Sequence, residues 1–148
     1  MIITDIKKDK KQKGIIVTTS DGSFIINTDV YFDSRIYKGM EITQKQIDLL
    51  ILQSAKKEAL NKAMAYISRK TCTQKMMRDY LHKKGFNNGV IDETLKKLID
   101  YKYIDDEEYA KTYICGSVGK GKLKLTYELK MRGIDESIIN KYILSPED

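Results

Sequence analysis

The sequence predicts a mainly α-helical protein, made of two tandem three-helix repeats behind a small N-terminal β-hairpin or sheet extension. Three observations support this prediction. Apolar, basic and glycine residues recur at a spacing of 48 positions in the second half of the chain. The first forty residues instead contain β-branched runs around Asp21-Gly22. The single proline, Pro146, lies near the end, so no proline interrupts helices before it.

The repeated segment is the strongest of these signals. Its first copy consists of Met77, Leu81, Lys84, Gly85, Phe86, Val90 and Ile91, and its second of Leu125, Leu129, Arg132, Gly133, Ile134, Ile138 and Ile139. Each residue of the second copy lies 48 positions after a residue of the same type in the first. A fixed period of this size is typical of helical arrays, whose units bury their apolar faces against neighbours. Such an array presents an extended surface and seldom a pocket, so binding is favoured over catalysis.

Residues 1–42 form the predicted β-rich extension. The β-branched run 14–20, the Asp-Gly turn at 21–22 and the run 23–28 predict a hairpin. Two or three strands alone are marginally stable in water, so the sheet is expected to pack on a helix. Asp29 is expected to cap a short helix through Ile36, with Gly39 beyond its end.

Residues 43–104 are predicted to contain a long helix and the first repeat. Thr43 is expected to cap a helix over 44–68, either continuous or bent near Ser54. Thr71 or Thr73 begins the next helix, which Gly85 ends in a left-handed conformation, and Asn87 caps the third.

Residues 105–148 are predicted to form the second repeat. Asp105 or Asp106 caps its first helix, Gly133 ends its second, and Asp135 caps its last. The acidic run 105–108 could hold a metal ion, but it directly precedes an apolar-periodic segment. A helix N-terminus, where carboxylates oppose the positive end of the helix dipole, is therefore the preferred interpretation.

Composition narrows the function classes. The chain has 27 Lys and Arg against 21 Asp and Glu, a net charge of +6, which favours an acidic partner such as nucleic acid or an acidic protein groove. The two cysteines, Cys72 and Cys115, form no CxxC motif, and His82 is the only histidine. Zinc sites, disulfide frameworks and Ser-His-Asp catalysis are therefore not expected. We expect a cytoplasmic monomer without a cofactor, a membrane span or enzymatic activity.

Basic residues cluster on the second helix of each predicted repeat, whereas the third helices lean acidic. Repetition of this segregation at the array period predicts a basic stripe along one side. The expected contact residues are Lys75, Arg78, Lys83, Lys84, Lys122, Lys124, Lys130 and Arg132. The alternative is a generic solvated face, the usual meaning of lysines on helices. Tyr101 and Tyr103 flank Lys102 in a connection and are candidates for stacking on a base.

Three motifs in order resemble the RecX family. Residues 103–110, YIDDEEYA, resemble the family string L-I-D-D-x-x-[FY]-A. Residues 73–86 are similar to the preceding stretch that ends in L-x-x-K-G-[FIV]. Residues 121–134 are similar to G-P-x-x-I-x-x-E-L-x-x-[KR]-G-I, with Lys122 in place of the proline. The resemblance covers residues 59–143, and the N-terminal strands resemble an extension of some bacterial members. The family usually has three three-helix units, and this chain has room for two.

The resemblance implies a regulator of the RecA recombinase. Family members bind RecA filaments on single-stranded DNA and inhibit ATP hydrolysis, strand exchange and coprotease action. The alternative from the residues alone is an autonomous helical nucleic-acid-binding module, whose lysines would give affinity for phosphate without sequence choice.

Overall fold

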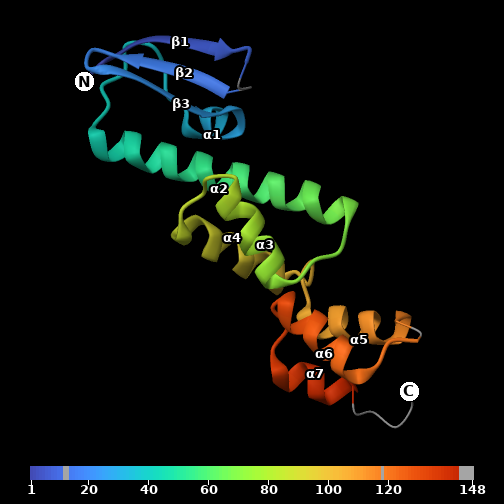
Figure 1. Ribbon diagram of the computed structural model, residues 1–148. Coiled ribbons are helices and arrows are strands. Elements are labelled where there is room, and N and C mark those ends of the chain that lie inside the picture. The colour runs from blue at the N-terminus through green and yellow to red at the C-terminus, as the bar shows by residue number, and fades with distance from the viewer. Residues whose placement is uncertain (12–13, 118, 144–148) are drawn as a thin grey trace. The chain divides into compact units, whose positions relative to one another are not determined.

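The computed structural model describes residues 1–11, 14–117 and 119–143 (Figure 1). Its elements are β1 (Ile3–Asp9), β2 (Gly14–Thr19), β3 (Gly22–Asn27), α1 (Thr28–Ser34), α2 (Gln44–Arg69), α3 (Gln74–Lys83), α4 (Asn88–Asp100), α5 (Asp106–Gly116), α6 (Lys122–Met131) and α7 (Glu136–Ile143). The chain divides into two compact units, Met1–Asn61 and Lys62–Asp148, and the division falls within α2. The predicted class, mainly helical repeats behind a small sheet, is confirmed. Pro146 and the end of the predicted second repeat lie outside the described residues.

The first unit contains a three-stranded antiparallel sheet in the order β1-β2-β3. The predicted hairpin is confirmed: Ile15 pairs with Ile26, Val17 with Phe24, and Gly22 in the turn has a φ of +145°. β1 adds a third strand and carries part of the basic run at 7–13, whose residues 12–13 lie outside the described part. Residues at alternate positions along a strand share one face, so Ile15 and Val17 both point into the core.

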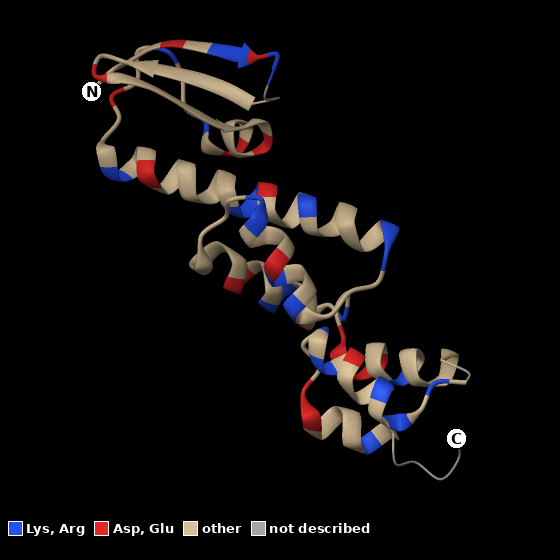
Figure 2. Cartoon of the chain, viewed as in Figure 1, with Lys and Arg blue, Asp and Glu red and all other residues tan. Residues whose placement is uncertain are grey.

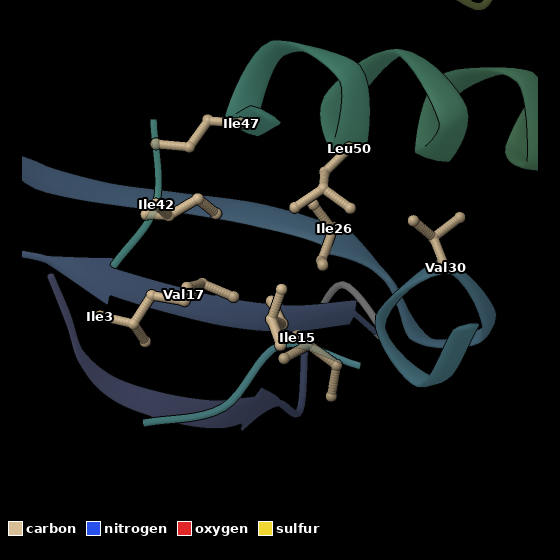
Figure 3. Close-up of a cluster of buried hydrophobic side chains, with 9 residues drawn as sticks. Ile3, Ile15, Val17, Ile26, Val30, Ile42, Ile47 and Leu50 are labelled. Carbon is tan, nitrogen blue, oxygen red and sulfur yellow. The ribbon is translucent and has the colours of Figure 1, made fainter. Parts of the chain in front are cut away.

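Helix α2 covers the inner face of this sheet (Figure 3). Packing on a helix was expected, because a sheet of so few strands is only marginally stable alone. Ile3 and Val17 are fully buried, and Ile47 and Leu50 of α2 pack in the same cluster. A polar contact adds to these apolar ones: the backbone N–H of Asn27 donates to the Ser54 hydroxyl at 2.9 Å. Ser54 is buried, and α2 runs through it as one helix of 26 residues, so the continuous form of the predicted helix is the observed one.

α2 begins with a capping box, in which two orphan N–H groups are satisfied reciprocally. The N–H of Gln46 donates to Thr43 Oγ1 at 3.2 Å, and the N–H of Thr43 donates to Gln46 Oε1 at 2.8 Å. Thr43 is thus the cap that the sequence predicted.

The prediction for α1 is wrong at both ends. Asn27, not Asp29, caps this helix: its Oδ1 accepts from the N–H groups of Asp29 at 2.8 Å and Val30 at 3.4 Å. Asn27 is the last residue of β3, and its extended backbone lets the side chain fold back over the first turn. The helix ends at Arg35, which has a φ of 58°, whereas Gly39 donates its N–H to the Ile3 carbonyl at 2.7 Å.

The repeats show the predicted helix boundaries with one exception: the Asp135 side chain accepts from the Ser137 hydroxyl and, in the described ranges, does not cap a backbone N–H of α7. Thr73, Asn87 and Asp105 cap α3, α4 and α5 through their side-chain oxygens. Gly85 and Gly133 follow the C-termini of α3 and α6 with φ values of +94° and +86°. α6 begins at Lys122, and the residue before it, Gly121, has no side chain with which to cap the helix.

The 48-residue period corresponds to a period of burial. Met77 and Leu81 of α3 are fully buried, and Leu125 and Leu129 of α6 are at most 5% exposed. The same holds for residues 91 and 139 and for residues 95 and 143. The repeated apolar positions therefore form the core of each repeat. No helix in the described ranges combines the length and apolar character that crossing a bilayer needs.

Candidate functional site

The two repeats are joined by hydrogen bonds at the start of α3. Thr73 Oγ1 donates to the Arg132 carbonyl at 2.5 Å, and the N–H of Gln74 donates to Asp106 Oδ1 at 2.9 Å. Lys75 Nζ reaches the Met131 carbonyl at 3.4 Å. These contacts hold the first turn of α3 against the start of α5 and the end of α6. Burial raises the pKa of the Asp106 carboxyl, and the bond from Gln74 opposes that rise.

Gly133 makes this joint possible. A Cβ atom at Gly133 would lie 2.3 Å from Lys75 Cβ, far inside normal contact distance. A Cβ atom at Gly85 would have no neighbour within 4 Å. The two glycines match in the repeat, but only Gly133 is required for close approach as well as for its backbone conformation.

Arg132, one of the eight predicted contact residues, is held by aromatic rings. Tyr109 and Tyr113 of α5 stack with ring centroids 6.3 Å apart and an interplanar angle of 10°. The Arg132 guanidinium carbon lies 6.0 Å from the centroid of Tyr109 and 4.6 Å from that of Tyr113. The guanidinium also donates to the Tyr109 hydroxyl, and this bond is the main reason that the pKa of Arg132 is raised. Cation–π contact and hydrogen bonding thus tie Arg132 to α5.

A second polar cluster links α5 to the loop before α6. Glu128 accepts from the Tyr113 hydroxyl and, at 2.9 Å, from Lys120 Nζ. These two bonds lower the pKa of Glu128, so the carboxylate stays charged. Glu128 therefore offers its charge to Lys120 and not to an outside ligand.

A cavity of about 380 Å³ opens where the repeats meet. It is lined by Thr71, Cys72, Lys102, Tyr103, Asp105, Glu108, Tyr109, Thr112, Tyr113 and Arg132. The expectation of a pocket-free array is therefore wrong for this joint. Burial raises the pKa of the Cys72 thiol to about 11, so it is not an activated nucleophile. Within the described residues, no group of three His, Cys, Asp or Glu side chains is placed to hold a metal ion.

The other predicted contact residues belong to α3, α6 and their ends, where Figure 2 colours lysine and arginine blue; all are exposed except Arg78, which is half-buried. Some have partners on the same chain: Arg78 pairs with Asp92 at 2.8 Å, Lys130 with Glu136 at 3.6 Å, and Lys84 lies 5.6 Å from the ring centroid of Tyr80. Such exposed pairs are weak and can exchange for an external anion. Lys83, Lys122 and Lys124 are exposed, and none forms an ion pair with another residue of the described ranges.

Sequence reasoning missed the internal role of Arg132. The spacing of Tyr109 and Tyr113, one helical turn apart, signals that the two rings share a face. It does not signal that the end of α6 would place a guanidinium over them. Asp105, by contrast, lies where predicted, accepting from the N–H groups of Glu107 and Glu108 at 3.1 Å.

Comparisons with known proteins agree with this architecture. The first three-helix domain of RecX matches residues 59–98, and the second matches residues 105–143. "Regulatory protein RecX" of Caldanaerobacter subterraneus subsp. tengcongensis is 33% identical over 98% of this chain and 75% of its own length. "Regulatory protein RecX" of Bacillus velezensis is 34% identical over 94% of this chain and 55% of its own length. A crystal structure of a regulatory protein RecX has the same fold, with a TM-score of 0.70 and 24% identity, covering 99% of this chain and 75% of that one. The chain thus spans between about half and three quarters of the length of these relatives, and with both domains matched in order it belongs to the RecX family.

Proposed function

We propose that this chain is a RecX-type regulator that binds the RecA filament on single-stranded DNA and inhibits its ATPase, strand-exchange and coprotease activities. Family membership supports a regulatory role, and the basic residues on α3 and α6 support an acidic target. The contacts between the two repeats are the observation that best supports the proposal. They fix the end of α6 against the start of α3, which supports treating the basic residues of these two helices as parts of one surface.

The proposed contact residues are the eight predicted from the sequence: Lys75, Arg78, Lys83, Lys84, Lys122, Lys124, Lys130 and Arg132. These residues differ in how far their side chains are already engaged in contacts within the chain. Lys83, Lys122 and Lys124 are exposed and form no ion pair within the described ranges, whereas Lys75 and Arg132 also have structural contacts. We therefore expect the free lysines to contribute binding, and Arg132 to contribute mostly through the position of α6.

The test is single-stranded-DNA-dependent ATP hydrolysis by the cognate RecA, with this chain titrated in. The test variant reverses four exposed lysines, Lys83→Glu, Lys84→Glu, Lys122→Glu and Lys124→Glu. A matched control reverses four exposed lysines outside α3, α6 and their ends, Lys45→Glu, Lys62→Glu, Lys96→Glu and Lys97→Glu. Both variants have the same net charge, so a general effect of charge cannot separate them.

We expect wild type and control to inhibit at similar concentrations and the test variant to require at least about tenfold more protein, because several phosphate or carboxylate contacts are lost together. Equal inhibition by both variants would refute the assigned surface. No inhibition by the wild-type chain would refute the regulatory mechanism itself.

The second candidate is an autonomous nucleic-acid-binding module, favoured by the same free lysines. Salt distinguishes the two. A protein held by phosphate contacts loses affinity for a DNA oligonucleotide linearly with log salt and needs no protein partner. Tight, salt-dependent DNA binding without any effect on RecA would support this candidate over the first.

A further inference from the structure

α6 carries a stripe of exposed apolar side chains, formed by Leu123, Tyr127 and Met131. Their exposed fractions are 89%, 65% and 60%. Residues four apart lie one above another on a helix, so these three share one face. They span about 12 Å along the axis, since each residue adds about 1.5 Å. A continuous apolar row of this kind on a water-exposed helix indicates a surface that another molecule covers.

The repeat itself does not require this stripe. The corresponding positions of α3, which lie 48 residues earlier, are Lys75, Asp79 and Lys83. α3 and α6 bury the same positions in their cores, but their outer faces have opposite character. The apolar stripe is therefore particular to α6.

Stacking of repeats does not account for it either. Where the second repeat joins the first, the stem of Lys75 packs on Gly133, whereas Asp79 and Lys83 remain exposed. A further repeat docked on α6 in the same way would cover Leu123 alone. Tyr127 and Met131 would stay in water, so they point to an occupant of another kind.

The flanking charges give the chemistry of that occupant. Lys122, Lys124 and Lys130 border the stripe, and all three are exposed. The acidic residue of this helix, Glu128, is held by Tyr113 and Lys120. A complementary surface has an apolar groove at its centre and carboxylates at its rim, because desolvated apolar contacts supply affinity and rim charges guide association.

We propose that the stripe Leu123–Tyr127–Met131 docks into an apolar groove, rimmed by carboxylates, on a protein partner. The inference rests on the proposed function, in which that protein is the recombinase. It assigns a different kind of contact to each of the two helices. α3, with Lys75 and Lys83 at the matching positions, faces phosphates. α6 faces protein.

The test measures binding of the chain to purified RecA protein without DNA and, separately, to a single-stranded oligonucleotide. The variant is Tyr127→Ser with Met131→Ser; both side chains are largely exposed, so the fold is expected to persist. The matched control is Phe32→Ser with Leu49→Ser, two apolar side chains of similar exposure, 69% and 54%, in the first unit. Circular dichroism spectra of both variants are compared with wild type to check that the fold persists.

We expect the Tyr127 and Met131 variant to bind RecA about tenfold more weakly, as for loss of a central apolar anchor, while its affinity for the oligonucleotide changes less than twofold. The control should match wild type in both assays. Unchanged binding to RecA overturns the inference and leaves the proposed function standing. Loss of oligonucleotide binding by the variant instead overturns the inference in favour of a base-stacking role for Tyr127. If wild type forms a concentration-dependent dimer that the variant does not form, the stripe binds a second copy of the chain and the inference is also overturned. A wild-type chain that does not bind RecA refutes the proposed function and this inference with it.

Discussion

Alanine at the two matched glycines should have very different costs. Both Gly85 and Gly133 have positive φ, where an alanine loses about 1 kcal/mol or somewhat more. Alanine also reduces the conformational freedom of the unfolded chain relative to glycine, and this effect offsets about 0.4–1 kcal/mol of the lost stability. Gly85→Ala meets open space, so its net destabilisation should be about 0.5–1 kcal/mol.

Gly133→Ala adds a collision that Gly85→Ala lacks. The new Cβ would lie 2.3 Å from Lys75 Cβ, whereas carbon atoms normally touch at about 3.5–4.0 Å. Lys75 Cβ is fixed to the backbone of α3, so the first turn of this helix must move away. That movement strains the bonds from Thr73 and Gln74, each worth about 1 kcal/mol. We expect a total of about 3 kcal/mol.

Urea denaturation followed by far-ultraviolet circular dichroism, or by the fluorescence of the ten tyrosines in this tryptophan-free chain, measures both values. A double-mutant cycle with Lys75→Gly isolates the collision, since that substitution removes the atom that the new Cβ at position 133 would strike. The pair should recover about 1–2 kcal/mol relative to the sum of the single changes. Equal costs at both glycines, or an additive cycle, would show that the joint is loose and the reasoning wrong.

Three further outcomes follow from single side chains. Cys115 is exposed and should react with a thiol reagent at pH 8, whereas burial and a pKa of about 11 should keep Cys72 unreactive until the protein unfolds; simultaneous labelling of both would contradict this. Hydrogen bonds from Lys141, at 2.5 Å, and from Tyr142 lower the pKa of Glu107, so the stability that Glu107 adds is present above its unfolded pKa of about 4.3 and is lost as pH falls through the lower folded value. Wild type and Glu107→Gln should accordingly differ in unfolding free energy at pH 6 and converge near pH 3, and a constant difference would argue against the linkage. Asn27→Ala should destabilise the first unit by about 1 kcal/mol through loss of the α1 cap, and Asn27→Asp should retain most of that stability in thermal melts.

Helix boundaries in the repeats could be predicted because their causes are local. Thr73, Asn87 and Asp105 each satisfy N–H groups two or three residues ahead, and Gly85 and Gly133 each supply one backbone conformation. α1 was misplaced because its cap also ends a strand. Asn27 belongs to the alternating pattern of β3, which hides its second role.

The joint between the repeats could not be predicted, because it depends on contacts far apart in the sequence. Thr73 was one of two predicted starts of α3, beside Thr71, but its hydroxyl also donates to the carbonyl of Arg132, 59 positions away. Arg132 in turn looks like its repeat counterpart Lys84, and both lie over tyrosine rings, but Arg132 contacts two rings of α5 and also donates to the Tyr109 hydroxyl. The 48-residue period matches each position of one repeat with the same position of the other. In the joint, however, the first repeat contributes the start of its second helix and the second repeat contributes the end of its own, so matching positions have different contacts.

In α3 and α6 the buried positions keep the residue types of the 48-residue repeat, whereas the exposed positions do not. Core positions must fill the same space in each three-helix unit, so residues 77 and 125, or 81 and 129, keep one chemical type. Exposed positions carry no such requirement: residues 79 and 127 are aspartate and tyrosine, and residues 83 and 131 are lysine and methionine. A difference confined to exposed positions does not serve folding, because replacing surface charge by exposed apolar side chains gives the fold nothing to bury. Under the inference drawn above, this difference lets the charged face of α3 and the apolar face of α6 contact two chemically distinct partners.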